Sequence, residues 1–448
     1  MSITELYSLR PRVLWQAFKS ENFAFWMACA YLFFEYVRPQ SIWPILNFYP
    51  YWGRTFVVLA LLGWLVSANK QFVWTSATTG VFFLLFIITL SSYTAYWPQV
   101  SWQHFMDYFS WVIVFFVLTQ TITTRQQFFI LLLIFMLASF KLSQFGAISW
   151  AASGFSYRSW GIRGPEGFFE NPGELAIQML VFAPIALFFI QGIKEHIKPW
   201  LVKFLYLMPI TAVFTIMGTN TRGGQLALAV QVLALIMMTK HRFKVIFAVT
   251  MITVAGYQFL PEEQKLRFEY SGKDVTSVQR LLYWEHGWTM MKEHPLLGVG
   301  YFNFIPYYER HHSEDIIGWR GRAELPHNIF IQVGTDTGFS GLAVFSLLIV
   351  GCYIGTRRIM QTAEANNDVF ISNMAKGMNV ALIGYVVAGQ FVTVAYYPFF
   401  WVHITLVTIM ATIIRNEVGD VEAINKEAVK NVGSAFNYGL ANLSEKKT

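Results

Sequence analysis

Long apolar segments recur along almost the whole chain, and this feature constrains the fold more than any other. Of the 448 residues, 55% are hydrophobic and 13% are charged, whereas a soluble domain carries about 25% charged residues. A run of about 20 apolar residues can cross a bilayer as a helix, and these runs lack the alternation typical of an outer-membrane barrel. We therefore predict an all-α, polytopic integral membrane protein with about twelve transmembrane helices. The predicted spans are residues 23–37, 55–69, 79–96, 105–122, 127–146, 174–193, 200–218, 224–240, 243–260, 339–356, 377–396 and 398–415.

The distribution of lysine and arginine predicts the orientation of the chain in the membrane. An even number of spans places both termini on one side, and the short connections on that side are rich in cations such as Arg12, Lys198, Arg242 and Arg358. Cytoplasmic loops carry such an excess, so we predict that both termini are cytoplasmic. The net charge of +7 then follows largely from topology and does not require a nucleic-acid partner.

The N-terminus and the cysteines carry no further targeting or redox signal. Residues 1–22 are polar, and the apolar run after them has no small-residue cleavage site, so no cleavable signal peptide is predicted. Cys29 and Cys352 lie inside predicted spans, where they would act as small apolar side chains. No disulfide framework is indicated.

The spans divide the chain into four parts. Residues 1–260 carry spans one to nine, and residues 261–337 form one long extracytoplasmic loop between spans nine and ten. Residues 338–416 carry spans ten to twelve, and residues 417–448 form a polar, lysine-rich cytoplasmic tail.

The long loop contains a predicted amphipathic helix over residues 275–293. Thr276 or Ser277 can cap its start, and Pro295 follows its end. We expect this helix to lie across the membrane surface as a lid. Its predicted apolar face consists of Val278, Leu281, Leu282, Trp288 and Met291.

Three polar residues at the outer ends of apolar segments are the main candidates for chemistry: Arg222, Arg280 and His327. Arg222 stands beside glycines that let the backbone approach a ligand, and a guanidinium at a helix N-terminus makes a good phosphate site. Arg280 lies in the first turn of the loop helix, where a cation is slightly unfavourable and an anionic partner is expected. His327 precedes an apolar helical run, whose N-terminus would keep the imidazole neutral and able to accept a proton.

Each of the three residues also has a simpler explanation. Arg222 can be an interfacial arginine at a helix end, and Arg280 can belong to a solvated helix face. His327 can make a structural hydrogen bond. In a chain this apolar, however, two arginines and a histidine on one side of the membrane favour an anionic ligand or a reaction.

A second polar cluster lies in the outer loop between the fifth and sixth predicted spans. Arg163 could add a phosphate contact. Glu170 or Glu174 could orient a histidine or bind sugar hydroxyls. Salt bridges within the loop explain these residues equally well.

Four histidines of the long loop receive no role from the sequence: His286, His294, His311 and His312. The last two precede Glu314 and Asp315, as in a metal-binding tract. The loop contains no HExxH motif and no i, i+4 histidine pair on a predicted helix, so we predict no metal site.

The order and spacing of several motifs resemble the O-antigen ligase family across most of the chain. These motifs are Thr219-Asn220-Thr221-Arg222-Gly223, the loop opening with Arg280, Glu293–Gly300, Pro326-His327-Asn328 and Asp336–Leu342. The family often has serine where this chain has Thr221, and glutamate where it has Asp336. Residues 163–171 resemble the branch of the family linked to exosortase-associated polysaccharide systems.

The resemblance implies glycosyl transfer on the periplasmic face of a bacterial cytoplasmic membrane. The donor would be a glycan on undecaprenyl diphosphate, and the acceptor a hydroxyl on a lipid, a glycan or a protein. Arg222 and Arg280 would bind the departing diphosphate, and His327 would take the acceptor proton. A guanidinium pair can replace the electrostatic role of a metal, so no metal or other cofactor is expected. The expected reaction is a single, inverting displacement.

Three other functions remain compatible with the sequence. A polysaccharide polymerase would use the same donor chemistry with a different acceptor groove. A secondary transporter would place charges near the membrane midplane in broken helices, whereas the candidates here lie at the outer face. A structural scaffold for polysaccharide assembly would tolerate the loss of His327.

Overall fold

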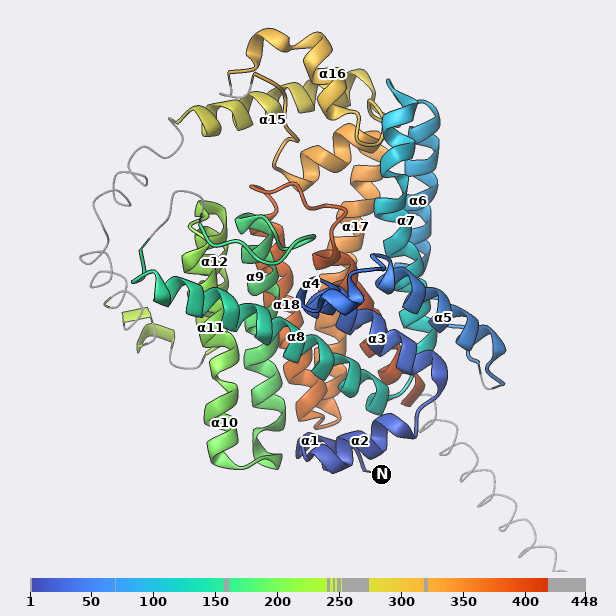
Figure 1. The fold of residues 1–448 in the computed structure, drawn as a ribbon, viewed down its shortest axis with the longest axis vertical. Coiled ribbons are helices and arrows are strands. Elements are labelled where there is room, and N and C mark those ends of the chain that lie inside the picture. Colours follow the sequence, from blue (N-terminus) through green and yellow to red (C-terminus); the bar gives the residue numbers. More distant parts are fainter. Residues whose placement is uncertain are drawn as a thin grey trace, which may run out of the picture.

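The described part of the chain is helical throughout. The computed structural model describes residues 2–68, 70–156, 161–239, 274–317 and 321–417, together with 242–244, 246–247 and 251. Within these residues all regular elements are helices, as predicted (Figure 1). The α-helices are α1 (Ile3–Tyr7), α2 (Pro11–Lys19), α3 (Phe23–Val37), α4 (Pro39–Ile42), α5 (Trp52–Val66), α6 (Ser76–Tyr93), α7 (Pro98–Thr121), α8 (Arg125–Ala152), α9 (Pro172–Ile193), α10 (Pro199–Leu205), α11 (Leu207–Gly218), α12 (Arg222–Met237), α15 (Val275–Glu293), α16 (Phe304–His311), α17 (Ile329–Ala365), α18 (Val369–Ala388) and a final helix, Pro398–Glu417.

Several of these helices can cross a membrane. Among the described residues, seven helical segments are long and apolar enough to do so. Three shorter helices, α3, α5 and α12, are also apolar. The chain is therefore a multi-pass membrane protein. Most of the predicted ninth span, residues 243–260, lies outside the described residues.

Two helices near the C-terminal end differ from the predicted boundaries. Helix α17 begins at Ile329, inside the predicted loop, because Asn328 caps it by accepting hydrogen bonds from the backbone of Phe330 and Ile331. Helix α18 ends at Ala388, whereas the predicted span ended at residue 396. Residues 389–397 instead form a connection with turns, and Gly389 accepts a hydrogen bond from the Ile329 backbone at 2.8 Å.

The centre of the bundle is formed by α9 and α18, which pack along most of their lengths. A buried glutamine joins α12 to this pair: Gln231 Nε2 donates to the carbonyls of Leu180 and Val380, at 2.8 and 2.9 Å. A Cβ at Gly384 would lie 2.0 Å from that nitrogen, so the contact requires glycine. This bridge fixes α12, whose first residue is Arg222.

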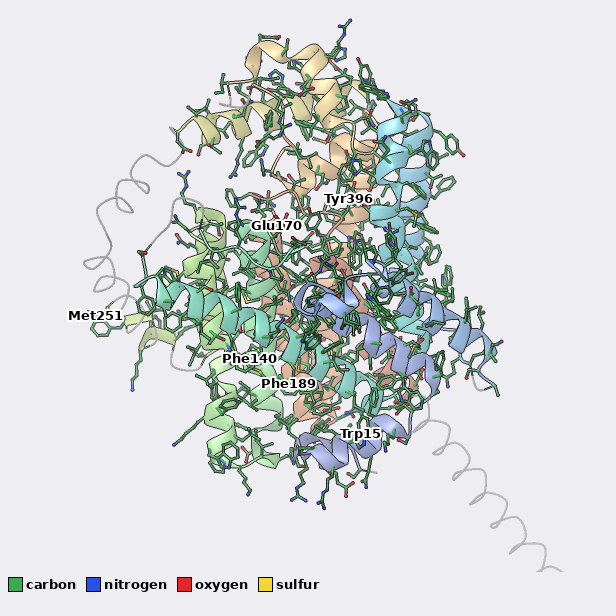
Figure 2. The ribbon with its side chains drawn as sticks, in the orientation of Figure 1. Trp15, Phe140, Glu170, Phe189, Met251 and Tyr396 are labelled. Atoms are coloured by element: carbon green, nitrogen blue, oxygen red, sulfur yellow. The ribbon has the colours of Figure 1, made fainter. Side chains whose placement is uncertain are left out.

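The two ends of the bundle carry different features. At one end Arg125 pairs with Asp368 and Glu417, which joins the start of α8, the start of α18 and the end of the final helix. Helices α1 and α2 lie at this end, with Trp15, while α15 and α16 cover the opposite end (Figures 1 and 2). Of the three candidate residues, Arg280 lies in α15, and Arg222 and His327 line the same cavity as Arg280.

Helix α17 is interrupted at Gly338, whose φ of +67° and ψ of −168° favour glycine. Residues 295–300 pack against this break: Phe339 N donates to Pro295 O at 2.7 Å, and Val299 N donates to Thr335 O at 2.9 Å. Asp336 is buried there and accepts a hydrogen bond from Phe302 N at 3.0 Å. The motifs Glu293–Gly300 and Asp336–Leu342 are therefore explained by their contact with each other.

Helix α15 has the predicted limits, but its buried face differs from the predicted one. Leu281 and Trp288 remain 54% and 49% exposed, and Met291 is the only member of the predicted face that is buried. The buried face consists of Gln279, Tyr283, Gly287, Met290 and Met291. It packs on α16 and α17, because aromatic side chains of α16 supply a separate small core. Helical periodicity alone could not select between the two faces.

Candidate functional site

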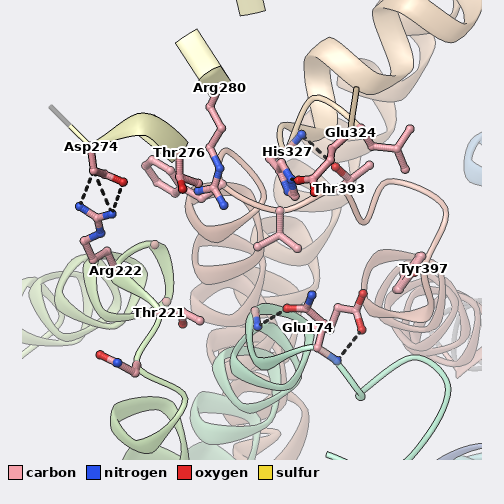
Figure 3. A pocket seen from close by; sticks show the side chains of 18 of the residues that line it. Glu174, Thr221, Arg222, Asp274, Thr276, Arg280, Glu324, His327, Thr393 and Tyr397 are labelled. Atoms are coloured by element: carbon pink, nitrogen blue, oxygen red, sulfur yellow. Dashed lines mark hydrogen bonds and ion pairs between the residues drawn. The ribbon is translucent and has the colours of Figure 1, made fainter. Parts of the chain in front are cut away.

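A cavity of about 870 Å³ lies between α15 and the first turns of α9 and α12. The turn before α12, the first turn of α9, the first turns of α15 and the segments 322–327 and 391–397 all contribute to its wall. Arg222, Arg280, His327 and Glu174 line it together (Figure 3). Four candidates from four separate segments thus share one site.

Arg222 is held by a carboxylate from the N-cap of α15. Its Nη2 lies 3.1 Å from Asp274 Oδ2, and both guanidinium Nη atoms donate to Oδ1 at 3.2 Å. Burial acts to raise the pKa of Asp274, but hydrogen bonds from Ser277 and Arg222 outweigh burial, and this pKa lies below its ordinary value. The pair ties the start of α12 to the start of α15.

The glycines after Arg222 also have a role in packing. A Cβ at Gly223 would lie 2.7 Å from the Phe391 side chain. A Cβ at Gly224 would lie 2.5 Å from Thr221 Oγ1 and 3.0 Å from Ala176 Cβ. Both residues line the cavity, but their size is already required by the neighbouring side chains.

Arg280 points from α15 into the middle of the cavity, beside Thr276 (Figure 3). Its Nε is buried without a hydrogen-bond partner, and none of its nitrogens is within ion-pair distance of a carboxylate in the described residues. Burial lowers the pKa of Arg280, and the nearby charge of Arg222 lowers it further, against the opposing effects of Asp274 and Glu324. Two guanidinium groups facing one space favour an anion between them.

His327 is fixed in the cavity wall by its backbone. Its φ of +52° lies in the left-handed region, and its N–H donates to Thr393 Oγ1 at 2.9 Å. Nε2 lies 3.5 Å from Glu324 Oε2. Burial lowers the pKa of His327, and Arg280 lowers it further, against the opposing effect of Glu324. The imidazole is therefore neutral at pH 7 and able to accept a proton.

The outer-loop candidates divide into two groups. Glu174 lies in the first turn of α9 and lines the cavity, and it also accepts a hydrogen bond from the Asn171 backbone at 3.1 Å. Arg163 and Glu170 are exposed and are not among the lining residues. Their suggested contacts with substrate stay predictions.

Sequence reasoning missed several lining residues: Glu309, Arg322, Glu324, Thr393 and Tyr397. Glu324 is the most informative of these, because it is the carboxylate beside His327. Its position three residues before the histidine was a usable signal. Thr393 and Tyr397 gave no such signal, because Thr393 stood in a predicted membrane span and Tyr397 was the single residue between two predicted spans.

The other loop histidines lie away from the cavity wall. His286 Nε2 lies 2.8 Å from Asp315 Oδ2, and the His286 and His312 rings stack at 3.9 Å. His311 stacks on Tyr307 at 4.2 Å, and His294 packs edge-on against the same ring. Across the described ranges, no three metal-ligating side chains gather as a candidate metal site.

Comparison with known proteins finds a match that covers most of the residues lining this cavity. A family model described as O-antigen ligase matches residues 207–346, which include Arg222, Arg280 and His327. This part of the chain belongs to the O-antigen ligase family. A second model, described as a family of unknown function, matches residues 13–194.

One similar protein gives a further comparison. The chain is 30% identical over 104 residues to the exopolysaccharide production protein ExoQ of Rhizobium meliloti (strain 1021). The match covers 22% of this chain and 24% of that relative, so it spans about a quarter of either protein. The resemblance of residues 163–171 to the exosortase-associated branch stays a prediction.

Proposed function

We propose that this protein is a membrane glycosyltransferase that moves a glycan from undecaprenyl diphosphate to an acceptor hydroxyl. The observation that carries the proposal is the position of Arg280, a cation without a carboxylate partner among the described residues, in one cavity with His327. A diphosphate supplies the missing negative charge, and a hydroxyl supplies the proton that a neutral imidazole accepts. The match to the O-antigen ligase family supports the same chemistry.

The donor would bind with its diphosphate between Arg222 and Arg280. Arg222 is the first residue of α12, so the positive end of that helix adds to the attraction. The polyprenyl chain of the donor would lie between the membrane helices.

The proposed reaction is one displacement at the anomeric carbon. His327 removes the proton of the acceptor hydroxyl as its oxygen forms the new glycosidic bond. The bond between the anomeric carbon and the diphosphate oxygen breaks, and undecaprenyl diphosphate leaves with the electron pair. The two arginines stabilise that charge without a metal, and attack from the opposite face inverts the anomeric configuration.

Asp274 competes with the proposed diphosphate for Arg222, which gives a first prediction. In Asp274→Asn, inorganic diphosphate should bind several-fold more tightly, since about 1 kcal/mol corresponds to about fivefold in affinity. The pair is partly exposed, so the thermal unfolding midpoint should change by less than about 4 °C. Calorimetric titration of the purified protein measures the affinity, with Asp315→Asn as the control. Equal diphosphate affinity in wild type and Asp274→Asn would contradict this site.

Glu324 sets the acid limit of activity, which gives a second prediction. Neutral His327 is needed, so kcat/KM should fall as the pH falls through a pKa below the ordinary 6.5. Because Glu324 raises the pKa of His327, Glu324→Gln should move this acid limb to lower pH, with a lower plateau. Initial rates from pH 4.5 to 8 measure the shift. An acid limb that stays at the wild-type pH would argue against His327 as the base.

The same proposal includes the arrangement in the membrane. The protein would cross a bacterial cytoplasmic membrane about twelve times. Both termini would be cytoplasmic and the cavity would face the periplasm. The four-part division at residues 260, 337 and 416 belongs to this proposal.

A polymerase is the second candidate, favoured by the similarity to an exopolysaccharide production protein. The two activities differ in the product. A ligase transfers one glycan to a different acceptor, whereas a polymerase lengthens the polyprenyl-linked glycan.

Transfer by the purified protein tests the proposal. A synthetic undecaprenyl-diphosphate oligosaccharide is incubated with lipid, glycan and peptide acceptors in the presence of EDTA. We expect release of undecaprenyl diphosphate and a product of inverted configuration. A trapped covalent glycosyl-enzyme would exclude the single displacement. Absence of transfer to every acceptor, the donor glycan included, would favour the transporter or scaffold.

A further inference from the structure

A second cavity, of about 690 Å³, lies between α3, α4, α5 and α7. Its wall is built largely by residues of the N-terminal segment that matches a family of unknown function. It meets the first cavity at one residue, Tyr397, which lines both. Glycan transfer as proposed above does not use it.

Charged side chains in this second cavity are balanced in sign: Glu35, Asp107, Arg38 and Arg54. Glu35 lies near the end of the apolar helix α3 and forms no hydrogen bond or ion pair in the described residues. Arg54 lies over the Tyr51 ring at 5.1 Å. Two buried polar atoms, Arg38 Nε and Gln40 Oε1, have no hydrogen-bond partner among the residues that the structure describes, which adds to the unused hydrogen-bonding capacity.

Arg38 is held in place by a specialised backbone arrangement. Its φ of +52° lies in the left-handed region, between α3 and α4. Its guanidinium donates to Glu166 O and covers Gly167, where a Cβ would lie 2.2 Å from it. Gly167 itself has a φ of +100°, so only glycine suits both the backbone and the contact. Such arrangements are maintained at sites that bind ligands.

Aromatic rings form much of the remaining wall: Tyr31, Tyr51, Trp111, Phe168, Tyr396 and Tyr397. A pyranose offers C–H faces that pack on aromatic rings and hydroxyls that hydrogen-bond with carboxylates and guanidinium groups. Two cations against two carboxylates favour a neutral ligand over an anion. We propose that the second cavity binds a neutral sugar unit of a glycan substrate.

The loop before α9 joins the two cavities. Ile162 N donates to Gly218 O at 3.1 Å, close to the turn that carries Arg222. Gly167 and Phe168 line the second cavity, and Glu174 lines the first. A glycan bound in the second cavity would therefore lie next to the proposed reaction site. The assignment of the bound sugar as part of a glycan substrate rests on the proposed function.

Direct binding tests the proposal without requiring transfer. Saturation-transfer NMR on the full-length purified protein uses the methyl glycosides of glucose, galactose and mannose as probes. We expect saturation transfer to at least one hexoside from wild type and from Arg280→Ala. The same transfer should be lost in Glu35→Gln, Arg54→Gln and Tyr51→Ala. Arg357→Gln is the matched control, because Arg357 lies over Tyr353 at 5.9 Å and lines neither cavity. No saturation in wild type, or full saturation in all three variants, overturns the proposal.

Transfer kinetics then identify the source of the sugar. In Glu35→Gln and Arg54→Gln we expect one KM to rise roughly tenfold or more, because a lost hydrogen bond to a charged group weakens binding on that scale. A rise in the acceptor KM assigns the cavity to the acceptor, and a rise in the donor KM assigns it to the donor glycan. Unchanged KM values in an active enzyme overturn the inference alone. Sugar binding in an enzyme without transfer would overturn the proposed function alone.

Discussion

His327→Ala is expected to abolish most glycan transfer, lowering kcat by about 10²–10⁴-fold, which is the usual contribution of a general base. The imidazole lies in the cavity wall and is kept neutral by burial and by Arg280. Its backbone contacts do not depend on the ring, because the N–H donates to Thr393. The fold should therefore survive the substitution. Initial rates with the polyprenyl-diphosphate donor measure the effect.

Two comparisons make the His327 result specific. His311→Ala is the matched control, because His311 stacks on Tyr307 in the same region and does not line the cavity. Diphosphate binding by His327→Ala should stay within about threefold of wild type, since the base does not hold the donor. Wild-type rates in His327→Ala would refute the role of this residue as the general base.

Arg280→Ala is expected to lower kcat/KM by about 10²–10³-fold, comparable to removal of one group that stabilises developing charge. Arg222 is already paired with Asp274, whereas Arg280 has no carboxylate partner in the described part of the chain. Arg280 should therefore carry the larger share of the interaction with diphosphate. Arg280→Lys should restore part of the rate, because a lysine keeps the charge but loses the fork geometry.

The control for Arg280→Ala is Arg310→Ala, an exposed arginine in the last turn of α16. Calorimetry with inorganic diphosphate should show weaker binding for Arg280→Ala and unchanged binding for the control. Normal membrane insertion and detergent extraction of both variants exclude misfolding. If Arg280→Ala binds diphosphate and transfers glycan as wild type does, the proposed donor site is wrong.

Local patterns in the sequence predicted the helices well. The segment 275–293 became α15 with those limits, because a capping region, a helical run and a following proline act over a few residues. The predicted spans near residues 377 and 339 were displaced by several residues. Their real ends depend on the contact between Gly389 and Ile329, which are far apart in the chain.

The candidate site was predicted in part. Arg222, Arg280 and His327 were identified because polar groups at the ends of apolar helices are conspicuous. Asp274 and Glu324 were missed as partners, since a pair such as Arg222 and Asp274 is separated by about fifty residues, and side-chain pairing depends on tertiary packing. Glu35 is a carboxylate inside an apolar helix, which is a usable signal for the second cavity, but no role was predicted for it.

The sequence by itself determined that this protein is helical, lies in a membrane and carries cations and a histidine beside apolar segments. Hydropathy and helix signals report on a residue and its near neighbours, so they suffice for those conclusions. Only the tertiary structure decided that α12, α15 and the segment around His327 meet at one cavity, and that Arg280 forms no ion pair there with any described residue. It also decided which face of α15 is buried. These features depend on side-chain packing between distant helices, which apolar patterns leave undetermined.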